Sequence, residues 1–257
     1  VSCYVDDLDS EDKGMFARPT LKEVTIGEQV LVLSSYLLSG SSITSINIPN
    51  TVATIGRNVF SNCDKLATLN IEDGSEKLYV YTQTTGGGAD WGPFYDSPLT
   101  TAYLGRDVAY KCSYENNDFT PEEWSDGFFA SEDDVETLTV TLTENVKTIS
   151  KFMFARRPIT EITVPASVEL IDDYAFYDCT SLSKITFTES TTPLNIGFQP
   201  FNNEVGPFYQ SPLTEINLNR QLNATYASKL DQNDEGIFSC SSRTEAITKL
   251  AMNNLTS

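Results

Sequence analysis

Apolar residues recur along the chain in a short pattern of the form L-x-x-I-x-I. The pattern starts at Leu21, Ile43, Leu66, Leu99, Val135, Ile159, Leu182, Leu213 and Ile247. The last two apolar positions of a unit lie two residues apart, as in Ile46 and Ile48, which predicts a short strand with one buried face. A strand of about six residues is not stable alone. We therefore expect nine parallel strands, stacked in sequence order around one continuous interior.

The units fall into two sets of four. Their spacings are 22, 23, 33 and 36 residues, and then 24, 23, 31 and 34 residues. The segment 92–100 (GPFYDSPLT) returns 114 positions later as 206–214 (GPFYQSPLT), so the chain is built by repetition. We divide this single solenoid into the tail of a preceding repeat (1–20), a first module (21–134), a second module (135–246) and the start of a further repeat (247–257).

The segment after each strand predicts how a coil turns back. Proline cannot donate to a ladder, so Pro49 and Pro165 mark strand ends. Apolar residues follow at helical spacing, as in Ile171, Ala175 and Cys179, and predict a short helical turn over the back of the core. Insertions at 72–91 and 188–204, and at 106–126 and 220–235, are expected to form loops on one side of the coil.

These positions read I-P-x-S/T-V-x-x-I-x-x-x-A/V-F-x-x-C-x-x-L. The pattern is carried by Ile48, Pro49, Thr51, Val52, Ile55, Gly56, Phe60, Cys63 and Leu66, and again by Val164, Pro165, Ser167, Val168, Ile171, Ala175, Phe176, Cys179 and Leu182. It resembles the BspA-like leucine-rich repeat family. The resemblance implies an α/β, right-handed leucine-rich repeat solenoid, with a parallel sheet on one face and short helical turns or extended segments on the other. Thr51 and Ser167 stand where the general repeat has Asn or Cys, so hydroxyl groups are expected to satisfy the turn backbone.

Composition removes several classes of function. With 17 basic and 36 acidic residues the net charge is −19, which disfavours nucleic acid and anionic lipid as partners. No apolar run approaches the ~20 residues of a membrane span, so this segment is not expected to insert into a membrane. The absence of histidine removes Ser-His-Asp and Cys-His sites and every imidazole metal site.

The remaining motifs for chemistry are weak. The five cysteines show no CxxC spacing, and Cys63 and Cys179 are expected to be small buried residues. The acidic segment 7–18 lacks the glycine and the final glutamate of a calcium loop, and residues 86–88 do not form a phosphate-binding turn. No carboxylate pair is singled out by its spacing, so we predict no catalytic, cofactor or metal residues and no enzymatic activity.

Partner contacts are expected from aromatic residues. The outward sheet positions are small side chains except for Tyr103, and small hydroxyl and amide groups in a parallel ladder can pair with one another. Most other candidate rings lie in or beside the insertions. The candidate partner-binding residues are Tyr79, Tyr81, Trp91, Tyr103, Tyr110, Tyr114, Phe119, Trp124 and Tyr226. The alternative is that these rings only pin the loops onto the coil.

The family resemblance implies protein recognition or adhesion at a bacterial cell surface, with a host extracellular matrix or serum protein as the candidate partner. A structural spacer is the alternative, and it would expose no aromatic patch. A carbohydrate-binding module is a third reading, and it would expose coplanar rings. Neither end of the chain carries an evident polar cap, so the ends are expected to be open to end-to-end contacts or to belong to a longer array.

Overall fold

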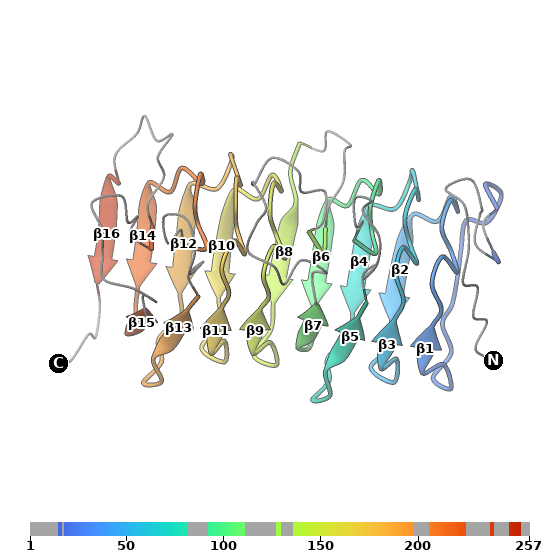
Figure 1. Ribbon diagram of the computed structural model, residues 1–257, viewed down its shortest axis with the longest axis horizontal. Coiled ribbons are helices and arrows are strands. Elements are labelled where there is room, and N and C mark those ends of the chain that lie inside the picture. Colours follow the sequence, from blue (N-terminus) through green and yellow to red (C-terminus); the bar gives the residue numbers. More distant parts are fainter. Residues whose placement is uncertain are drawn as a thin grey trace, which may run out of the picture.

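The computed structural model describes residues 15–16, 18–81, 92–110, 127–129, 136–197, 206–224, 237–238 and 247–252. These residues form sixteen short strands and no helix. Every strand pair is parallel, and successive coils stack side by side along the long axis (Figure 1). Each coil between β2 and β15 contributes one strand to a first row and one to a second row, so the described residues form a solenoid of parallel strands.

The first row carries the strands that the L-x-x-I-x-I pattern predicts. It consists of β2 (Ser45–Ile48), β4 (Thr68–Ile71), β6 (Thr101–Leu104), β8 (Thr139–Leu142), β10 (Glu161–Val164), β12 (Lys184–Phe187), β14 (Glu215–Leu218) and β16 (Lys249–Met252). Two four-stranded sheets make up the row, β2-β4-β6-β8 and β10-β12-β14-β16. The strand expected at Leu21 is wrong, because residues 21–27 contain no strand.

The second row was not predicted as strands. It consists of β1 (Val32–Leu33), β3 (Thr54–Ile55), β5 (Leu78–Val80), β7 (Val108–Tyr110), β9 (Thr148–Ile149), β11 (Leu170–Ile171), β13 (Leu194–Ile196) and β15 (Leu222–Ala224). Its pairing order is β1-β3-β5-β7 and β9-β11-β13-β15. The two rows are interrupted on opposite sides of one coil: the second row breaks before the coil of β8 and β9, and the first row breaks after it.

The helical turn expected after the second-row strand is also wrong. The backbone N–H of Phe176 donates to the Pro207 carbonyl at 2.8 Å, and that of Asp178 donates to the Tyr209 carbonyl at 2.9 Å. These bonds join one coil to the next, whereas an α-helix would use carbonyls four residues back. Tyr174 and Asp178 have φ values of 55° and 52°, in the left-handed region that no α-helix contains.

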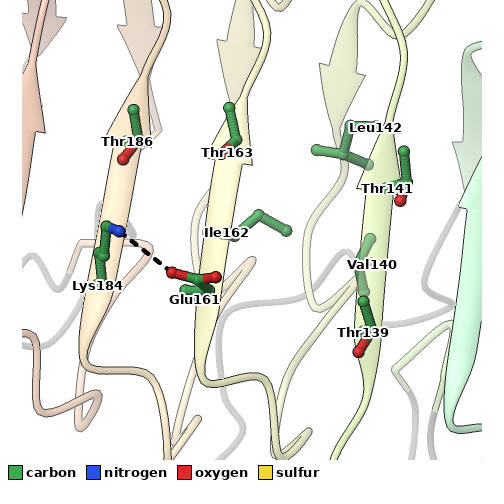
Figure 2. A pocket seen from close by; sticks show the side chains of 9 residues that line it. All are labelled: Thr139, Val140, Thr141, Leu142, Glu161, Ile162, Thr163, Lys184 and Thr186. Carbon is green, nitrogen blue, oxygen red and sulfur yellow. Dashed lines mark ion pairs between the residues drawn. The ribbon is translucent and has the colours of Figure 1, made fainter.

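We call the two unpaired places, between β7 and β9 in the second row and between β8 and β10 in the first row, the seam, and Figure 2 shows the second of them. The single continuous ladder expected from the sequence is broken here, because no pairing joins β8 to β10 or β7 to β9. Side chains bridge the second row instead: the Asp107 carboxylate accepts the backbone N–H groups of Lys147 and Thr148 at 2.9 and 2.8 Å. The Ser150 hydroxyl donates to the Val108 carbonyl at 3.3 Å.

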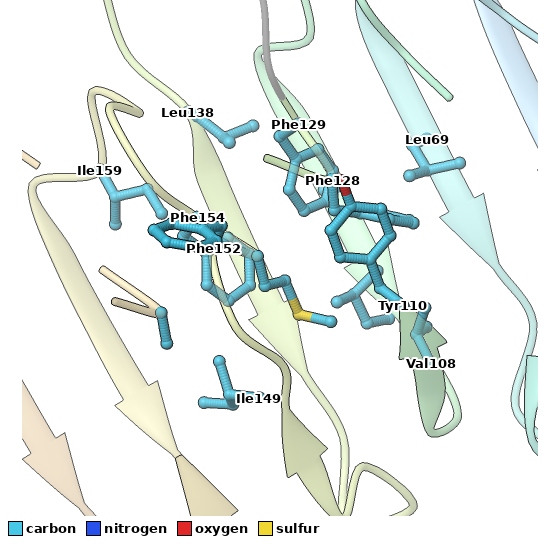
Figure 3. Packing of buried hydrophobic residues seen from close by; sticks show 14 of the residues in the cluster. Leu69, Val108, Tyr110, Phe128, Phe129, Leu138, Ile149, Phe152, Phe154 and Ile159 are labelled. Atoms are coloured by element: carbon cyan, nitrogen blue, oxygen red, sulfur yellow. The ribbon is translucent and has the colours of Figure 1, made fainter. Parts of the chain in front are cut away.

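One hydrophobic cluster nevertheless extends through the described coils on both sides of the seam. The predicted core residues Ile46, Leu69, Leu138 and Ile162 are at most 3 % exposed, which confirms their placement. A row of stacked phenylalanine rings runs through this core, and we call it the phenylalanine row. Its successive ring centroids are 5.1, 6.2, 5.5, 5.2 and 5.1 Å apart, through Phe60, Phe94, Phe129, Phe154, Phe176 and Phe208. Figure 3 shows Phe129 and Phe154, the pair that lies on the two sides of the gap between β7 and β9.

Cys63 and Cys179 are buried free thiols, as predicted. The Cys179 thiol donates to the Phe154 carbonyl at 3.0 Å, and burial raises its pKa to about 12. Burial likewise raises the pKa of Cys63. Neither thiol is therefore ionised near neutral pH, which fits a packing role.

Two arginines are fully buried in this acidic chain. Arg106 is 0 % exposed and donates to the carbonyls of Pro49, Asn50 and Val52 at 3.0, 3.0 and 2.8 Å, two coils earlier. Desolvation lowers its pKa. The expected hydroxyl donor of this turn, Thr51, has no hydrogen-bond partner for its buried oxygen. The Arg106 guanidinium therefore donates to the backbone carbonyls of a turn that a hydroxyl group was expected to satisfy.

The second module repeats this arrangement. Arg220 is 1 % exposed and donates to the carbonyls of Ala166 and Val168 at 3.2 and 2.9 Å, and to the Thr192 carbonyl at 2.7 Å. Here the predicted hydroxyl also contributes, because Ser167 Oγ donates to the Val146 carbonyl at 2.9 Å. We call Arg106 and Arg220 the arginine clamps.

Candidate functional site

The outward face of the first row carries a chain of paired polar side chains. The Asn70 amide donates to Asn47 Oδ1, and the Asn47 amide donates to Glu72 Oε1 at 2.6 Å. In the second module the Asn217 amide donates to Thr186 Oγ1 at 3.2 Å. These contacts confirm that small polar residues on this face pair with one another, which gives them a structural role.

Tyr103 is part of the same polar surface. Its hydroxyl donates to the Asp73 carboxylate at 3.0 Å. That hydrogen bond raises the pKa of Tyr103, because the neutral phenol is the donor. The Asn145 amide reaches the same carboxylate at 3.4 Å and the Gly105 carbonyl at 3.0 Å. The Tyr103 ring is thus oriented by its neighbours on the first row.

Tyr79 and Tyr81 lie on the other row, on β5 and directly after it. Their rings are 50 % and 57 % exposed, so they form a surface pair. Tyr103 belongs to a different sheet, and the structure does not bring it together with this pair. Among the described residues, only Tyr79 and Tyr81 therefore remain of the expected aromatic edge.

Tyr110 is a correction to the predicted set. It is 6 % exposed, and its ring packs edge-on against Phe128 at 5.6 Å, as Figure 3 shows. The ring belongs to the core because Tyr110 is the last residue of β7 and its side chain points inward. The periodicity of the first-row strands did not reveal which residues of β7 point inward. The remaining predicted residues lie outside the described part of the chain: Trp91, Tyr114, Phe119, Trp124 and Tyr226.

The tyrosine pair distinguishes the first module from the second. β5 and β13 hold the same place in their sheets, and Asn195 stands in β13 where Tyr79 stands in β5. Asn195 is tied into a polar ladder: its amide donates to the Glu169 carbonyl at 3.1 Å, and it accepts from the Asn223 amide at 3.1 Å. The repeat thus tolerates a small amide where the first module exposes a large ring.

A hollow of about 380 Å³ lies at the seam (Figure 2). It is lined by Thr139, Val140, Thr141, Leu142, Glu161, Ile162, Thr163, Lys184 and Thr186. Lys184 Nζ and a Glu161 carboxylate oxygen form an ion pair at 3.2 Å on its rim. Val140 and Leu142 are only half-buried, whereas the matching apolar residues of β2, β4, β6 and β10 are buried.

The described residues offer little for catalysis. They contain no cluster of three or more Asp, Glu or Cys side chains that could hold a metal ion. A perturbed carboxyl does occur at Asp172, where burial and the adjacent Asp173 raise its pKa to about 6. Lys151 Nζ lies 2.9 Å from the Asp173 carboxylate. This group lies in the turn after β11 and is not among the residues that line the hollow.

Comparison with known families decides what kind of repeat this is. A family model for the BspA type leucine rich repeat region matches six copies, over residues 7–83, 110–226 and 147–257. The chain belongs to the BspA-type leucine-rich repeat family. No match was found among curated proteins or solved structures. The resemblance seen in the sequence is thus confirmed, and the BspA-type repeat accounts for the parallel, stacked strands.

Sequence reasoning missed the arginine clamps and the seam of this BspA-type chain. A signal for the clamps was available, because an arginine follows the strand two residues on in both modules, in L-G-R-D and L-N-R-Q. The seam also has a signal, because the register pairs Leu104 with Leu142: the unit predicted to start at Val135 starts two residues later, where Thr137 replaces the first apolar residue. In the described part of the chain, no helix reaches the length and apolar character of a membrane span.

Proposed function

We propose that this BspA-type repeat is a non-catalytic recognition module that binds a protein partner at a bacterial cell surface. The observation that carries the proposal is the exposed pair Tyr79 and Tyr81 on β5. Tyrosine is enriched among the residues that dominate binding energy at protein interfaces, because it buries a large ring and keeps a polar hydroxyl. The corresponding position of the second module, Asn195, shows that the fold does not require a ring there.

Charge narrows the class of partner. At a net charge of −19 the chain attracts basic surfaces, and long-range attraction of this kind raises association rates. A host extracellular matrix or serum protein with a basic surface is the partner class that we propose. The described residues provide a rigid surface for such a partner, because their strands share one hydrophobic core.

The test is a pull-down from host matrix and serum proteins with the intact chain as bait. The variant Tyr79→Asn with Tyr81→Ser removes both rings and places at position 79 the residue that the second module carries. Tyr103→Asn is the matched control, because it removes an equally large ring from the first row and copies Asn217 of β14.

We expect the double variant to lose the captured protein by at least about tenfold, which corresponds to a change of about 1.4 kcal/mol. Tyr103→Asn should retain it. Undiminished capture by a folded double variant would contradict the role of Tyr79 and Tyr81. The absence of any specifically captured protein would favour the spacer reading, and capture abolished by soluble sugars would favour a carbohydrate-binding module.

A further inference from the structure

The gap between β8 and β10 leaves backbone groups without a strand partner. The N–H groups of Thr139 and Thr143 donate toward β6. Backbone groups alternate in direction along a strand, so the N–H and C=O groups of Val140 and Leu142 point toward β10. Within the described residues no backbone hydrogen bond joins β8 to β10. The edge of β8 can therefore bond to a ligand.

The facing edge of β10 has the same property. The Val164 carbonyl accepts from the Thr188 N–H, toward β12. By the same alternation the backbone groups of Glu161 and Thr163 point toward β8. Cα atoms of β8 and β10 approach within 8 Å of one another. A third strand between them would need about 9.5 Å, twice the spacing of neighbouring strands, so the gap suits a small ligand and not an inserted strand.

The hollow of about 380 Å³ lies at this gap and has an aliphatic floor. Figure 2 shows the side chains of Leu142 and Ile162 extending toward each other in the space between the two strands, with Val140 nearby. Val140 and Leu142 are only half-buried, so a ligand in the hollow would remove apolar surface from water. The volume lies near the lower end of the range of about 300–1,000 Å³ that is usual for small-ligand sites.

The described rim of the hollow is polar and carries no net charge. Lys184 and Glu161 form an ion pair at 3.2 Å, so each neutralises the other. The other polar side chains of the rim are the hydroxyl groups of Thr139, Thr141, Thr163 and Thr186. A hydroxyl group both donates and accepts hydrogen bonds, and the two strand edges add backbone N–H donors and C=O acceptors. The hollow thus offers an uncharged set of donors and acceptors above an apolar floor.

We propose that the hollow binds a neutral sugar residue of a glycan. A pyranose ring carries hydroxyl groups around its edge, which donate and accept hydrogen bonds, and C–H groups on its faces. The hydroxyl groups pair with the threonines and the backbone edges, and a C–H face covers Val140 and Leu142. This is a second binding site, and it is independent of the protein-recognition site at Tyr79 and Tyr81.

Other classes of ligand fit the hollow less well. A phosphate or another anion meets the net charge of −19 and a single lysine that Glu161 already neutralises. An aliphatic side chain of a protein would cover the floor, but it would leave the hydroxyl and amide groups of the rim desolvated without partners. A neutral sugar satisfies both floor and rim. The coplanar rings expected of a carbohydrate site are not required, because the described lining holds the sugar by hydrogen bonds.

A microarray of neutral, sialylated and sulfated glycans tests the proposal with the intact chain. We expect binding to neutral glycans that share one sugar residue, and no binding that requires a sialic acid or a sulfate. Isothermal titration calorimetry with the methyl glycoside of the shared sugar then measures the affinity in solution. The absence of any bound neutral glycan, or binding to acidic glycans alone, would overturn the proposal.

The double variant Thr141→Val with Thr163→Val removes one hydroxyl group on each side of the gap and keeps the branched shape that suits a strand. Thr68→Val with Thr101→Val is the matched control, because these exposed threonines lie on β4 and β6 of the same row and do not line the hollow. We expect the affinity for the methyl glycoside to fall at least about tenfold in the first variant and to stay within about twofold in the control. Equal affinities of the two variants would count against the site.

Amide NMR spectra of the wild type locate the bound glycoside without any substitution. The amide signals that should shift are those of the facing edges, Val140, Leu142, Glu161 and Thr163. The amide signals of Asn47 and Asn70, on β2 and β4, should stay in place. A shift elsewhere that leaves the four edge amides unchanged would remove the hollow as the sugar site.

The two binding sites are separable by their variants. Tyr79→Asn with Tyr81→Ser should bind the methyl glycoside like the wild type, and Thr141→Val with Thr163→Val should capture the protein partner like the wild type. Loss of glycoside binding in the folded tyrosine variant would contradict a site at the hollow. Failure of the glycan experiments alone would leave the protein-recognition function standing.

Discussion

The two copies of the nonapeptide differ at one position, where Asp96 stands in the first module and Gln210 in the second. Both residues adopt positive φ, 51° and 60°. The left-handed region costs roughly 1–2 kcal/mol for most L-residues, and aspartate tolerates it because its short side chain can hydrogen-bond locally. The second module therefore carries the less suitable residue at this turn.

Gln210→Asp should raise the free energy of unfolding by about 0.5–1 kcal/mol, because it relieves this backbone cost. Denaturant unfolding at moderate salt measures the change, since added negative charge on an acidic chain is then screened. Gln210→Ala is the control, because alanine tolerates positive φ no better than glutamine. Equal stability of the two variants would contradict the explanation.

Asp172 is the residue at which stability should depend on pH. Its folded pKa of about 6 lies above the ordinary value of 3.8, mainly because the carboxyl is buried and secondly because Asp173 is beside it. A raised carboxyl pKa means that the folded state binds the proton more tightly. The contribution of this tighter proton binding to the free energy of unfolding is complete below the unfolded pKa, and it is lost as the pH rises through about 6.

Asp172→Asn should therefore stabilise the chain at pH 7, by about 1–3 kcal/mol. The amide is neutral at every pH, and its oxygen can still accept the Asp173 N–H, which now lies 3.0 Å from Asp172 Oδ1. Unfolding measured between pH 4 and 7 should show the advantage shrinking as the pH falls. An advantage that stays constant across this range would argue against titration of Asp172 as the cause.

At the scale of elements, the arginine clamps show how a turn can be completed from two coils away. The carbonyls that follow β2 point into the structure, and Arg106 supplies donors to three of them. Arg220 serves the turn after β10 in the same way. Each clamp thus reaches two coils back, and Arg220 also donates to the coil between, at the Thr192 carbonyl.

Arg106→Met keeps much of the side-chain volume but removes the guanidinium donors of the Asn50 and Val52 carbonyls, while the Pro49 carbonyl keeps the Val52 N–H. We expect a loss of about 2–4 kcal/mol in the free energy of unfolding, set by the cost of unsatisfied buried polar groups. Arg220→Met should lose a similar amount, measured in the same denaturant titration. A loss within experimental error for both variants would show that water or the turn itself satisfies these carbonyls.

The elements of the first row were predictable because their residues alternate strictly, as in Ile46 and Ile48. The second-row strands were not, because each has only two or three residues and their alternation is too short to detect. The helical spacing of Ile171, Ala175 and Cys179 was misleading, since alternate N–H groups of this turn donate to the next coil and the bonds within the turn span only three residues. Tyr110 was wrongly expected at the surface, because β7 is also too short for its alternation to be detected. Tyr79 and Tyr81 could be predicted as candidates, but the face on which they lie could not.

At the scale of the whole molecule, the seam marks where two blocks of paired strands overlap, because the coil of β8 and β9 is paired to one block by β8 and to the other by β9. The gap between β7 and β9 is crossed by the phenylalanine row, through Phe129 and Phe154, and by the polar bridges of Asp107, Ser150 and Asn145. In a repeat protein, stability is the sum of the coils and of the interfaces between neighbours. Each of the two interfaces at the seam keeps only one of its two ladders, β6–β8 on one side and β9–β11 on the other.

Asp107→Ala should weaken the contact between β7 and β9 by about 2–4 kcal/mol. The reason is that the backbone N–H groups of Lys147 and Thr148 lose a charged acceptor. We expect calorimetry to resolve two unfolding transitions in place of one. Asp107→Asn retains the side-chain oxygen and loses only the ion pair with half-exposed Lys77, so it should keep a single transition. One transition in the alanine variant would contradict a weak seam.

The parallel ladders have a mechanical consequence. Their hydrogen bonds point along the long axis, from one coil to the next (Figure 1). Tension applied between β1 and β16 would thus peel coils apart in series, each rupture releasing a short length of chain. Under such a load the molecule would behave as an extensible tether, and it would yield first between β8 and β10.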